Sequence, residues 1–163
     1  TYLKYTIVGD GPLKESFQQL IKELGVDRIV TFVGWNLQQL VIVILKNSDI
    51  MLAPSVTSFD GDREGIPVVL METMAMGLPI ISTLHSGIPE FVENGVSGFL
   101  TPERDVDALA EKLNYLVENP EIWNNMGAAG RAFVEEHYNI DKLNDKLVEI
   151  YNSSVSIGMA NYS

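Results

Sequence analysis

The chain has 163 residues, of which 46% are hydrophobic, so it is long enough and apolar enough for one domain with a substantial core. Its 22 acidic and 11 basic residues leave a net charge of −11, which argues against nucleic acid or an anionic lipid surface as the main partner. Cysteine is absent, no apolar run reaches membrane-spanning length, and no signal peptide is expected at the start. Disulfides and thiol chemistry are therefore excluded, membrane association is not indicated, and a cytoplasmic location is expected.

In chain order, the sequence predicts strands that alternate with helices. Strands are expected at residues 2–8, 29–33, 50–53, 80–82 and 99–100, which are short β-branched or apolar runs. Helices are expected at residues 12–24, 37–46, 67–76, 105–117, 121–137 and 140–151, where most apolar residues recur at helical spacing. The run from Val41 to Ile44 has strand propensity, but the need for a crossover favours a helix there. Residues 153–163 are expected to fray. The alternation predicts an α/β fold with a parallel sheet flanked by helices.

Two glycine-bearing segments follow or end the first two expected strands. They consist of Gly9, Asp10 and Gly11 after the first strand, and Val33, Gly34 and Trp35 at the second. Open α/β sheets bind ligands at the carboxyl ends of their strands, so Trp35 at the end of the second strand could shelter a ligand. Two alternatives stay open. Gly9 and Gly11 resemble part of a dinucleotide fingerprint, although the third glycine is absent, and the indole of Trp35 could simply pack in the core.

Residues 60–89 are expected to form, in chain order, an acidic, glycine-bearing loop, a short apolar helix, a buried strand and a second glycine turn. Pro67 suits the first helical position, and Gly77 followed by Pro79 suits the helix end. A helix that is apolar nearly all round is expected to be buried. A carboxylate inside it, Glu72, is therefore unusual, because buried unpaired charges are costly.

Glu64 and Glu72 flank the start of this helix in the sequence. The free N–H groups of a helix start favour anions, and Gly65 lets another group approach the backbone. The two carboxylates could accept hydrogen bonds from hydroxyls on either side of a bound phosphate, which is the layout of a nucleotide-sugar. From the residues alone, an equal alternative is that Glu72 is a solvated helix position and Glu64 is ordinary loop charge.

These motifs in combination resemble a known family. Glu64-Gly65-Ile66-Pro67, followed by Glu72 and then by residues 74–79, resembles the E-x7-E signature of retaining glycosyltransferases of family 4, the glycosyl transferases group 1. Other segments that match the same family are residues 7–12, 86–90 and 94–100. The resemblance extends from about residue 5 to about residue 138. The sequence of residues 59–89 is most similar to that of bacterial exopolysaccharide glycosyltransferases of the colanic-acid type.

The resemblance implies a Rossmann-like domain, the carboxyl-terminal, nucleotide-sugar-binding half of a two-domain GT-B type glycosyltransferase. Residues 1–163 would be a single domain without its first strand, without the cationic Gly-Arg…Lys motif and without the amino-terminal acceptor domain. The implied reaction moves a sugar from a nucleoside-diphosphate sugar to a hydroxyl acceptor, with retention at the anomeric carbon. The partners would be that donor and a sugar or lipid-linked acceptor on the missing domain, with no cofactor and no metal. The chain by itself is expected to be inactive.

The resemblance also implies residue roles. Glu64 would contact the donor-sugar hydroxyls and act in catalysis by positioning and electrostatics, while Glu72 would bind the ribose. Residues expected to line the phosphate end are Glu64, Gly65, Ile66, Pro67, Val68 and Val69. Those expected near the base are Val33, Gly34 and Trp35, with the turn of Gly9, Asp10 and Gly11 close to the site.

Other features of the sequence allow different interpretations. Asp60-Gly61-Asp62 resembles a D-x-D metal motif of another glycosyltransferase fold, but two carboxylates with no nearby histidine favour a solvated loop. His85 could hydrogen-bond a ligand, although a surface loop histidine is the commoner case. A nucleotide-sugar epimerase and a non-catalytic nucleotide-sugar-binding module stay open as functions. The sequence names neither the nucleotide, the sugar nor the acceptor.

The implied missing strand has a topological consequence. A doubly wound sheet of order 3-2-1-4-5-6 loses its central strand when its first strand is absent. We therefore expect a break in the sheet between residues 2–8 and 50–53. The flanking strands would then pair directly, accept a strand from another chain, or fold poorly.

Overall fold

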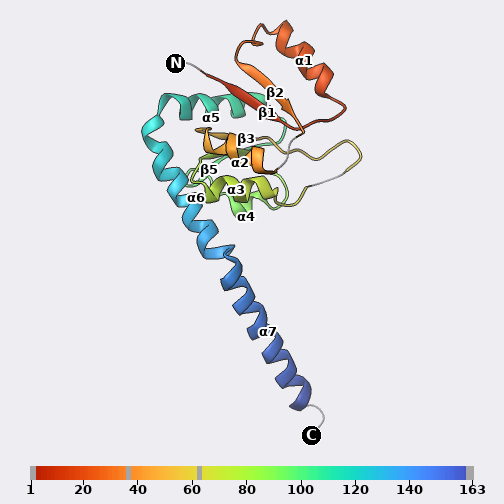
Figure 1. Ribbon diagram of the computed structural model, residues 1–163, viewed down its shortest axis with the longest axis vertical. Helices are drawn as coiled ribbons and strands as arrows, with labels where there is room; N and C mark the ends of the chain where they lie inside the picture. The colour runs from red at the N-terminus through yellow and green to blue at the C-terminus, as the bar shows by residue number, and fades with distance from the viewer. Residues whose placement is uncertain (1–2, 36–37, 62–63, 161–163) are drawn as a thin grey trace. The chain divides into compact units, whose positions relative to one another are not determined.

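The computed structural model describes residues 3–35, 38–61 and 64–160, with side chains described as far as residue 153 (Figure 1). Two compact units divide the chain, Thr1–Asn47 and Ser48–Ser163. Each unit combines parallel strands with helices, so the expected α/β class is confirmed in both. None of the helices in the described ranges is both long enough and apolar enough to cross a bilayer.

The first unit is built on one pair of parallel strands. β1 (Tyr5–Val8) pairs with β2 (Val30–Gly34), with one irregularity of register near the end of β1. The helices of this unit are α1 (Lys14–Glu23) and α2 (Gln38–Lys46). The β-branched run of residues 41–44 lies inside α2, which confirms the helix expected from the crossover. Leu45 is the one buried residue among those that the structure describes in this unit.

The second unit holds a sheet of three parallel strands in the order β3-β4-β5. The strands are β3 (Met51–Ala53), β4 (Ile80–Thr83) and β5 (Gly98–Thr101). The helical elements are α3 (Val68–Ala75), α4 (Ile88–Phe91), α5 (Val106–Glu118), η1 (Pro120–Ile122), α6 (Trp123–His137) and α7 (Ile140–Ala160). All four residues of β4 are buried, as expected for the central strand of a parallel sheet covered on both faces.

Two apolar clusters lie on the two faces of this sheet. Ile80 belongs to one cluster and Ile81 to the other, and successive strand residues point to opposite faces. The first cluster contains Leu70, Met74, Ile80, Ile88, Phe91, Val92 and Leu100. The second contains Ile81, Leu116 and Met126. α3 and α4 therefore contribute to the core of one face, and α5 contributes to the core of the other.

The expected break in the sheet is present in the described residues. β1 pairs with β2 in one sheet, and β3 pairs with β4 in a second sheet. Direct pairing between residues 2–8 and 50–53, one of the expected outcomes, is therefore not formed by the part of the chain that the structure describes. The break was predicted because the family resemblance implies that the first strand of the domain is absent. That absence stays a prediction.

Several helix boundaries differ from the sequence prediction. α1 begins at Lys14 rather than at Pro12. Pro67 is the N-cap of α3 rather than its first residue, because its ψ of 129° keeps it extended while its ring allows the φ of −60°. α4 lies where only a glycine turn was expected, and a helix of four residues is too short to show a period in the sequence.

The expectation that residues 153–163 fray is wrong as far as residue 160, where α7 ends. The helix continues to Ala160, and the Ser153 hydroxyl donates to the Ile150 carbonyl one turn earlier, so this serine bonds within the helix. In Figure 1 α7 continues beyond the sheet of its unit as one long helix. Its predicted apolar face is exposed at Leu143, Leu147 and Ile150. Other predicted positions that lie outside the described residues are Tyr2, Leu37, Asp62 and residues 161–163.

Candidate functional site

The start of α3 offers backbone donors in the second unit. Pro67 is buried and extended, and it supplies no side-chain cap to the helix. The Leu70 N–H donates to the Pro67 carbonyl at 2.9 Å, so intrahelical bonding begins at that residue. The N–H groups of Val68 and Val69 precede it and have no acceptor within the helix. This end of α3 can therefore donate hydrogen bonds to an anion.

Glu64 and Glu72 differ in exposure. Glu64 is exposed in the loop before α3, whereas Glu72 is partly buried on α3. Glu72 follows Val68 by four residues and precedes Ala75 by three, so all three lie on one side of the helix. Val68 is 65% exposed and Ala75 is also exposed, so the expectation that α3 is buried all round is wrong. The buried side holds Leu70, Thr73 and Met74, which leaves the side of Glu72 open.

The second glycine turn touches the loop that carries Glu64. A Cβ atom on Gly87 would lie only 2.9 Å from Cγ1 of Ile66. A side chain at residue 87 would therefore push Ile66, which is two residues after Glu64. The structure thus brings together two motifs that the sequence could only place far apart in the chain.

Hydrogen bonds also join the carboxyl ends of the three strands in this sheet. The Ser82 hydroxyl donates to the Ala53 carbonyl at 2.7 Å, which links β4 to β3. The Leu84 N–H donates to the Thr101 carbonyl at 2.8 Å, which links the loop after β4 to β5. The loops that follow β3, β4 and β5 therefore start from fixed positions at one edge of the sheet.

His85 is buried at this edge, so the surface position favoured from the sequence is wrong. Its side chain is 1% exposed, and Nδ1 lies 2.7 Å from Oε1 of Glu103. Glu103 also accepts the Thr57 N–H at 2.9 Å. The Thr57 N–H and then the His85 imidazole hold the pKa of Glu103 below its ordinary value. Nε2 of His85 is the one buried side-chain polar atom without a hydrogen-bond partner in the described part of the chain.

Sequence reasoning missed Glu103, Arg104 and Thr57. The Arg104 guanidinium donates to the Thr57 carbonyl at 2.7 Å and lies 5.1 Å from the centre of the Phe59 ring. Arg104 also has a φ of +63°, a conformation that is uncommon for residues other than glycine. The available signal was positional, because each of these residues follows the end of a strand in a parallel sheet.

The other predicted site residues lie in the first unit. The Gly9 N–H donates to the Gly34 carbonyl at 2.9 Å, and both glycines have positive φ, 136° and 73°. Asp10 accepts hydrogen bonds from Lys14 at 2.8 Å and from the Gly11 N–H at 2.9 Å. Those bonds, the one from Lys14 first, lower the pKa of Asp10. Trp35 is 79% exposed, so the alternative that its indole packs in the core is wrong.

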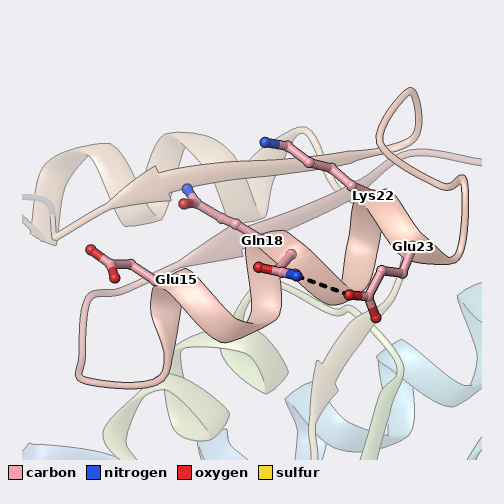
Figure 2. A pocket seen from close by; sticks show the side chains of 5 residues that line it. Glu15, Gln18, Lys22 and Glu23 are labelled. Carbon is pink, nitrogen blue, oxygen red and sulfur yellow. Dashed lines mark hydrogen bonds between the residues drawn. The ribbon is translucent and has the colours of Figure 1, made fainter.

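The Asp60-Gly61-Asp62 motif lies only partly within the described residues, and the cavities are lined by other residues than those predicted for the site. No group of three or more histidines and carboxylates within residues 3–35, 38–61 and 64–160 is placed to hold a metal ion, and Asp62 lies outside those ranges. Figure 2 shows side chains that line a shallow cavity of about 260 Å³ on α1, with Gln19 bonded to Glu23 at 3.0 Å. A groove of about 570 Å³ includes Phe99 and Lys112. Neither cavity is lined by a predicted site residue.

Comparison with known proteins gives a consistent result. The family model described as glycosyl transferases group 1 matches residues 2–133. The putative colanic acid biosynthesis glycosyltransferase of Escherichia coli is 48% identical over 110 residues, which cover 68% of this chain and 27% of that protein. The amylovoran biosynthesis glycosyltransferase of Erwinia amylovora is 43% identical over 147 residues, covering 90% of this chain and 36% of that protein.

The fold also has solved counterparts. The Anabaena protein HepE in complex with UDP superposes with a TM-score of 0.80 at 24% identity, over 93% of this chain and 41% of that one. Its complex with UDP-glucose gives a TM-score of 0.77 at 25% identity, over 92% and 41%. These likenesses confirm the Rossmann-like fold of GT-B glycosyltransferases.

The chain spans only 27% to 36% of the length of the curated relatives named above. The family model nevertheless matches most of this chain, residues 2–133, and the match includes the segment from Glu64 to Glu72. The chain therefore belongs to the glycosyl transferases group 1 family.

Proposed function

We propose that this chain binds a nucleoside-diphosphate sugar and provides the donor site of a retaining glycosyltransferase of family 4. The observation that carries the proposal is the start of α3, where backbone N–H groups that have no acceptor within the helix follow Glu64 and precede Glu72. The UDP-glucose complex of the Anabaena protein supports this class of ligand. The colanic acid and amylovoran relatives support a role in exopolysaccharide synthesis.

The parts of the donor have distinct partners in this proposal. Backbone N–H groups of Gly65, Ile66, Val68 and Val69 donate to the diphosphate, helped by the positive end of the α3 dipole, whereas Pro67 has no N–H to donate. Glu64 accepts hydrogen bonds from the sugar hydroxyls, and Glu72 accepts them from the ribose. The roles of Val33 to Trp35 near the base, and of the turn Gly9 to Gly11, stay predictions.

Transfer would break the bond between the anomeric carbon and the phosphate oxygen. The acceptor oxygen would bond to that carbon on the same face of the sugar, and its proton would pass to the leaving phosphate. This route needs no protein nucleophile, and Glu64 contributes by positioning the sugar and by electrostatics. The acceptor hydroxyl belongs to a sugar or a lipid-linked sugar.

The two rival functions are not favoured. The relatives and solved structures named above include glycosyltransferases with similarity over most of this chain, and none of them is described as an epimerase. The family membership likewise favours transfer over a purely non-catalytic binding module.

Titration with nucleotide-sugars tests the proposal directly. Because the chain spans about a third of its relatives, the assay is binding rather than turnover. UDP-glucose, GDP-mannose and ADP-glucose are each added to the chain, and the melting temperature and the heat of binding are measured. A ligand that binds only the folded state raises the melting temperature. Uridine serves as the control without phosphates, and a failure of all three sugars to bind at millimolar concentration contradicts the proposal.

A further inference from the structure

One hydrogen-bond network holds the backbone of Thr57 on both sides. Glu103 accepts the Thr57 N–H at 2.9 Å, and the next residue, Arg104, donates to the Thr57 carbonyl at 2.7 Å. Thr57 lies near the start of the loop that runs from β3 to α3, and Glu64 lies near the end of that loop. The loop that carries Glu64 is therefore fixed at its start by the loop after β5.

The same glutamate also fixes the turn after β4. His85 is buried, and its Nδ1 lies 2.7 Å from Oε1 of Glu103. The His85 carbonyl accepts the Ile88 N–H at 3.0 Å, which closes the turn that contains Gly87. Gly87 packs against Ile66 so closely that a Cβ would lie 2.9 Å from it. Ile66 immediately precedes Pro67, the N-cap of α3.

The loop that carries Glu64 is thus held at both ends by contacts that meet at Glu103. At one end the contact is direct, through Thr57. At the other end it runs through His85 and the Gly87 turn to Ile66. We infer that Glu103 and His85 are positioning residues, which hold Glu64 and the start of α3 in the arrangement that receives the donor.

The geometry also shows which ring nitrogen of His85 makes the contact with Glu103. A carboxylate only accepts hydrogen bonds, so the proton of His85 that faces Glu103 is on Nδ1. Nε2 is buried and bonds to no group in the described residues, so the positioning role needs only the Nδ1 side of the ring. An asparagine can place its amide nitrogen near the position of Nδ1, which makes His85→Asn a conservative rescue, whereas His85→Phe keeps a ring and removes the bond.

The test measures the loop with and without a ligand. The methyl resonance of Ile66 in isotope-labelled chain reports the contact with Gly87, and titration with UDP-glucose reports donor binding. The variants are Glu103→Ala, Glu103→Gln, His85→Phe and His85→Asn. Glu111→Gln is the matched control, because it removes a carboxylate that pairs with the neighbouring Lys112, at 2.8 Å on α5.

Glu103→Ala and His85→Phe are expected to shift or broaden the Ile66 signal and to weaken UDP-glucose binding by about tenfold, the loss of one hydrogen bond to a charged group. His85→Asn is expected to keep the native signal and an affinity within about threefold of the native chain. Glu103→Gln retains one acceptor and is expected to give an intermediate signal, and it replaces Glu103→Ala if that variant does not fold.

The inference is overturned if the Glu103 variants leave the Ile66 signal native, or if His85→Asn behaves like His85→Phe. It rests on the proposed function only for the ligand. If the native chain binds no nucleotide-sugar, the proposed function fails, while the Ile66 signal without ligand still decides whether Glu103 positions the loop.

Discussion

Glu72 is accessible because of its place on α3, on the side that also holds Val68 and Ala75. The opposite side of α3, with Leu70 and Met74, is fully buried in the core. A change of the Glu72 head group at constant size therefore affects what binds at this surface more than it affects the packing of the helix.

We expect Glu72→Gln to lower the affinity for UDP-glucose about tenfold, because a neutral amide accepts ribose hydroxyl hydrogen bonds less strongly than a carboxylate. Glutamate and glutamine have similar helix propensities, so the melting temperature should change little. Calorimetric titration and a thermal scan of the same samples measure the two effects. Unchanged nucleotide affinity in the variant would contradict the ribose role of Glu72.

Glu103 is expected to make the folded state less stable as the pH falls into the acid range. Its pKa is lowered by the hydrogen bonds from the Thr57 N–H and from His85, so the folded state binds its proton less readily than the unfolded chain does. The resulting stabilisation is present above the ordinary glutamate pKa of about 4.3 and is lost as the pH falls through the lower, folded value.

Acid unfolding should therefore be less steep in Glu103→Gln than in the native chain. Stability is measured by denaturant titration at several values between about pH 6 and pH 3. Glu111→Gln removes a carboxylate outside the network and is the control. Equal pH dependence in the native chain and in Glu103→Gln would show that this carboxylate is not stabilised by its partners.

At the scale of elements, α3 and α6 pack at backbone distance. Gly77 follows the C-cap of α3 and has a φ of 77°, and a Cβ on Gly127 of α6 would lie 1.8 Å from the Gly77 carbonyl oxygen. Gly130, one turn later, faces Met74, where a Cβ would lie 3.3 Å from Cγ. Two glycines of α6 thus allow the helix that carries Glu72 to lie this close.

Gly127→Ala should destabilise the second unit by about 1–3 kcal/mol, because the methyl group overlaps backbone rather than a movable side chain. The gain in helix propensity of about 0.5–1 kcal/mol offsets only part of this cost. Thermal unfolding is expected to occur several degrees lower. Asn124→Ala, at an exposed position of α6, is the control, and a variant as stable as the native chain would mean that α3 and α6 separate without cost.

At the scale of the whole molecule, the two units differ in core. Leu45 is the one described residue of the first unit that is buried, whereas the second unit buries two apolar clusters around β4. Local stability follows buried apolar contact and protected backbone hydrogen bonds. The first unit should therefore open more readily.

Hydrogen exchange followed by mass spectrometry measures this difference. Amides of β1 and β2 are expected to exchange at least about tenfold faster than those of β4, since each 1.4 kcal/mol of local stability is a factor of ten. Equal protection in both units would contradict the prediction and would indicate that they unfold together.

We also expect the 163-residue chain to transfer no sugar on its own. The chain spans 27% to 36% of the curated relatives compared above, and a reaction between two substrates depends strongly on holding both in position. Incubation with a radiolabelled donor and a panel of sugar acceptors measures transfer. Labelled product made by this chain alone would contradict this prediction.

Local patterns were enough to predict the alternation of strands and helices and the motif from Glu64 to Glu72. Even α2 was predicted correctly, because the crossover requirement outweighed the strand propensity of residues 41–44. Helix spacing and glycine positions act within a few residues, so they can be read along the chain. Short α4 and the last turns of α7 were missed, because neither has a periodic pattern of its own.

The tertiary structure alone decided which distant groups meet. Glu103 is 46 residues from Thr57 and 18 from His85, and no spacing rule connects them. They meet because parallel pairing of β3, β4 and β5 brings three carboxyl ends to one edge, where the loop residue His85 is buried beside Glu103. The sequence by itself determined the elements and the Glu64–Glu72 motif, through short-range spacing, whereas the environment of that motif depends on strand pairing.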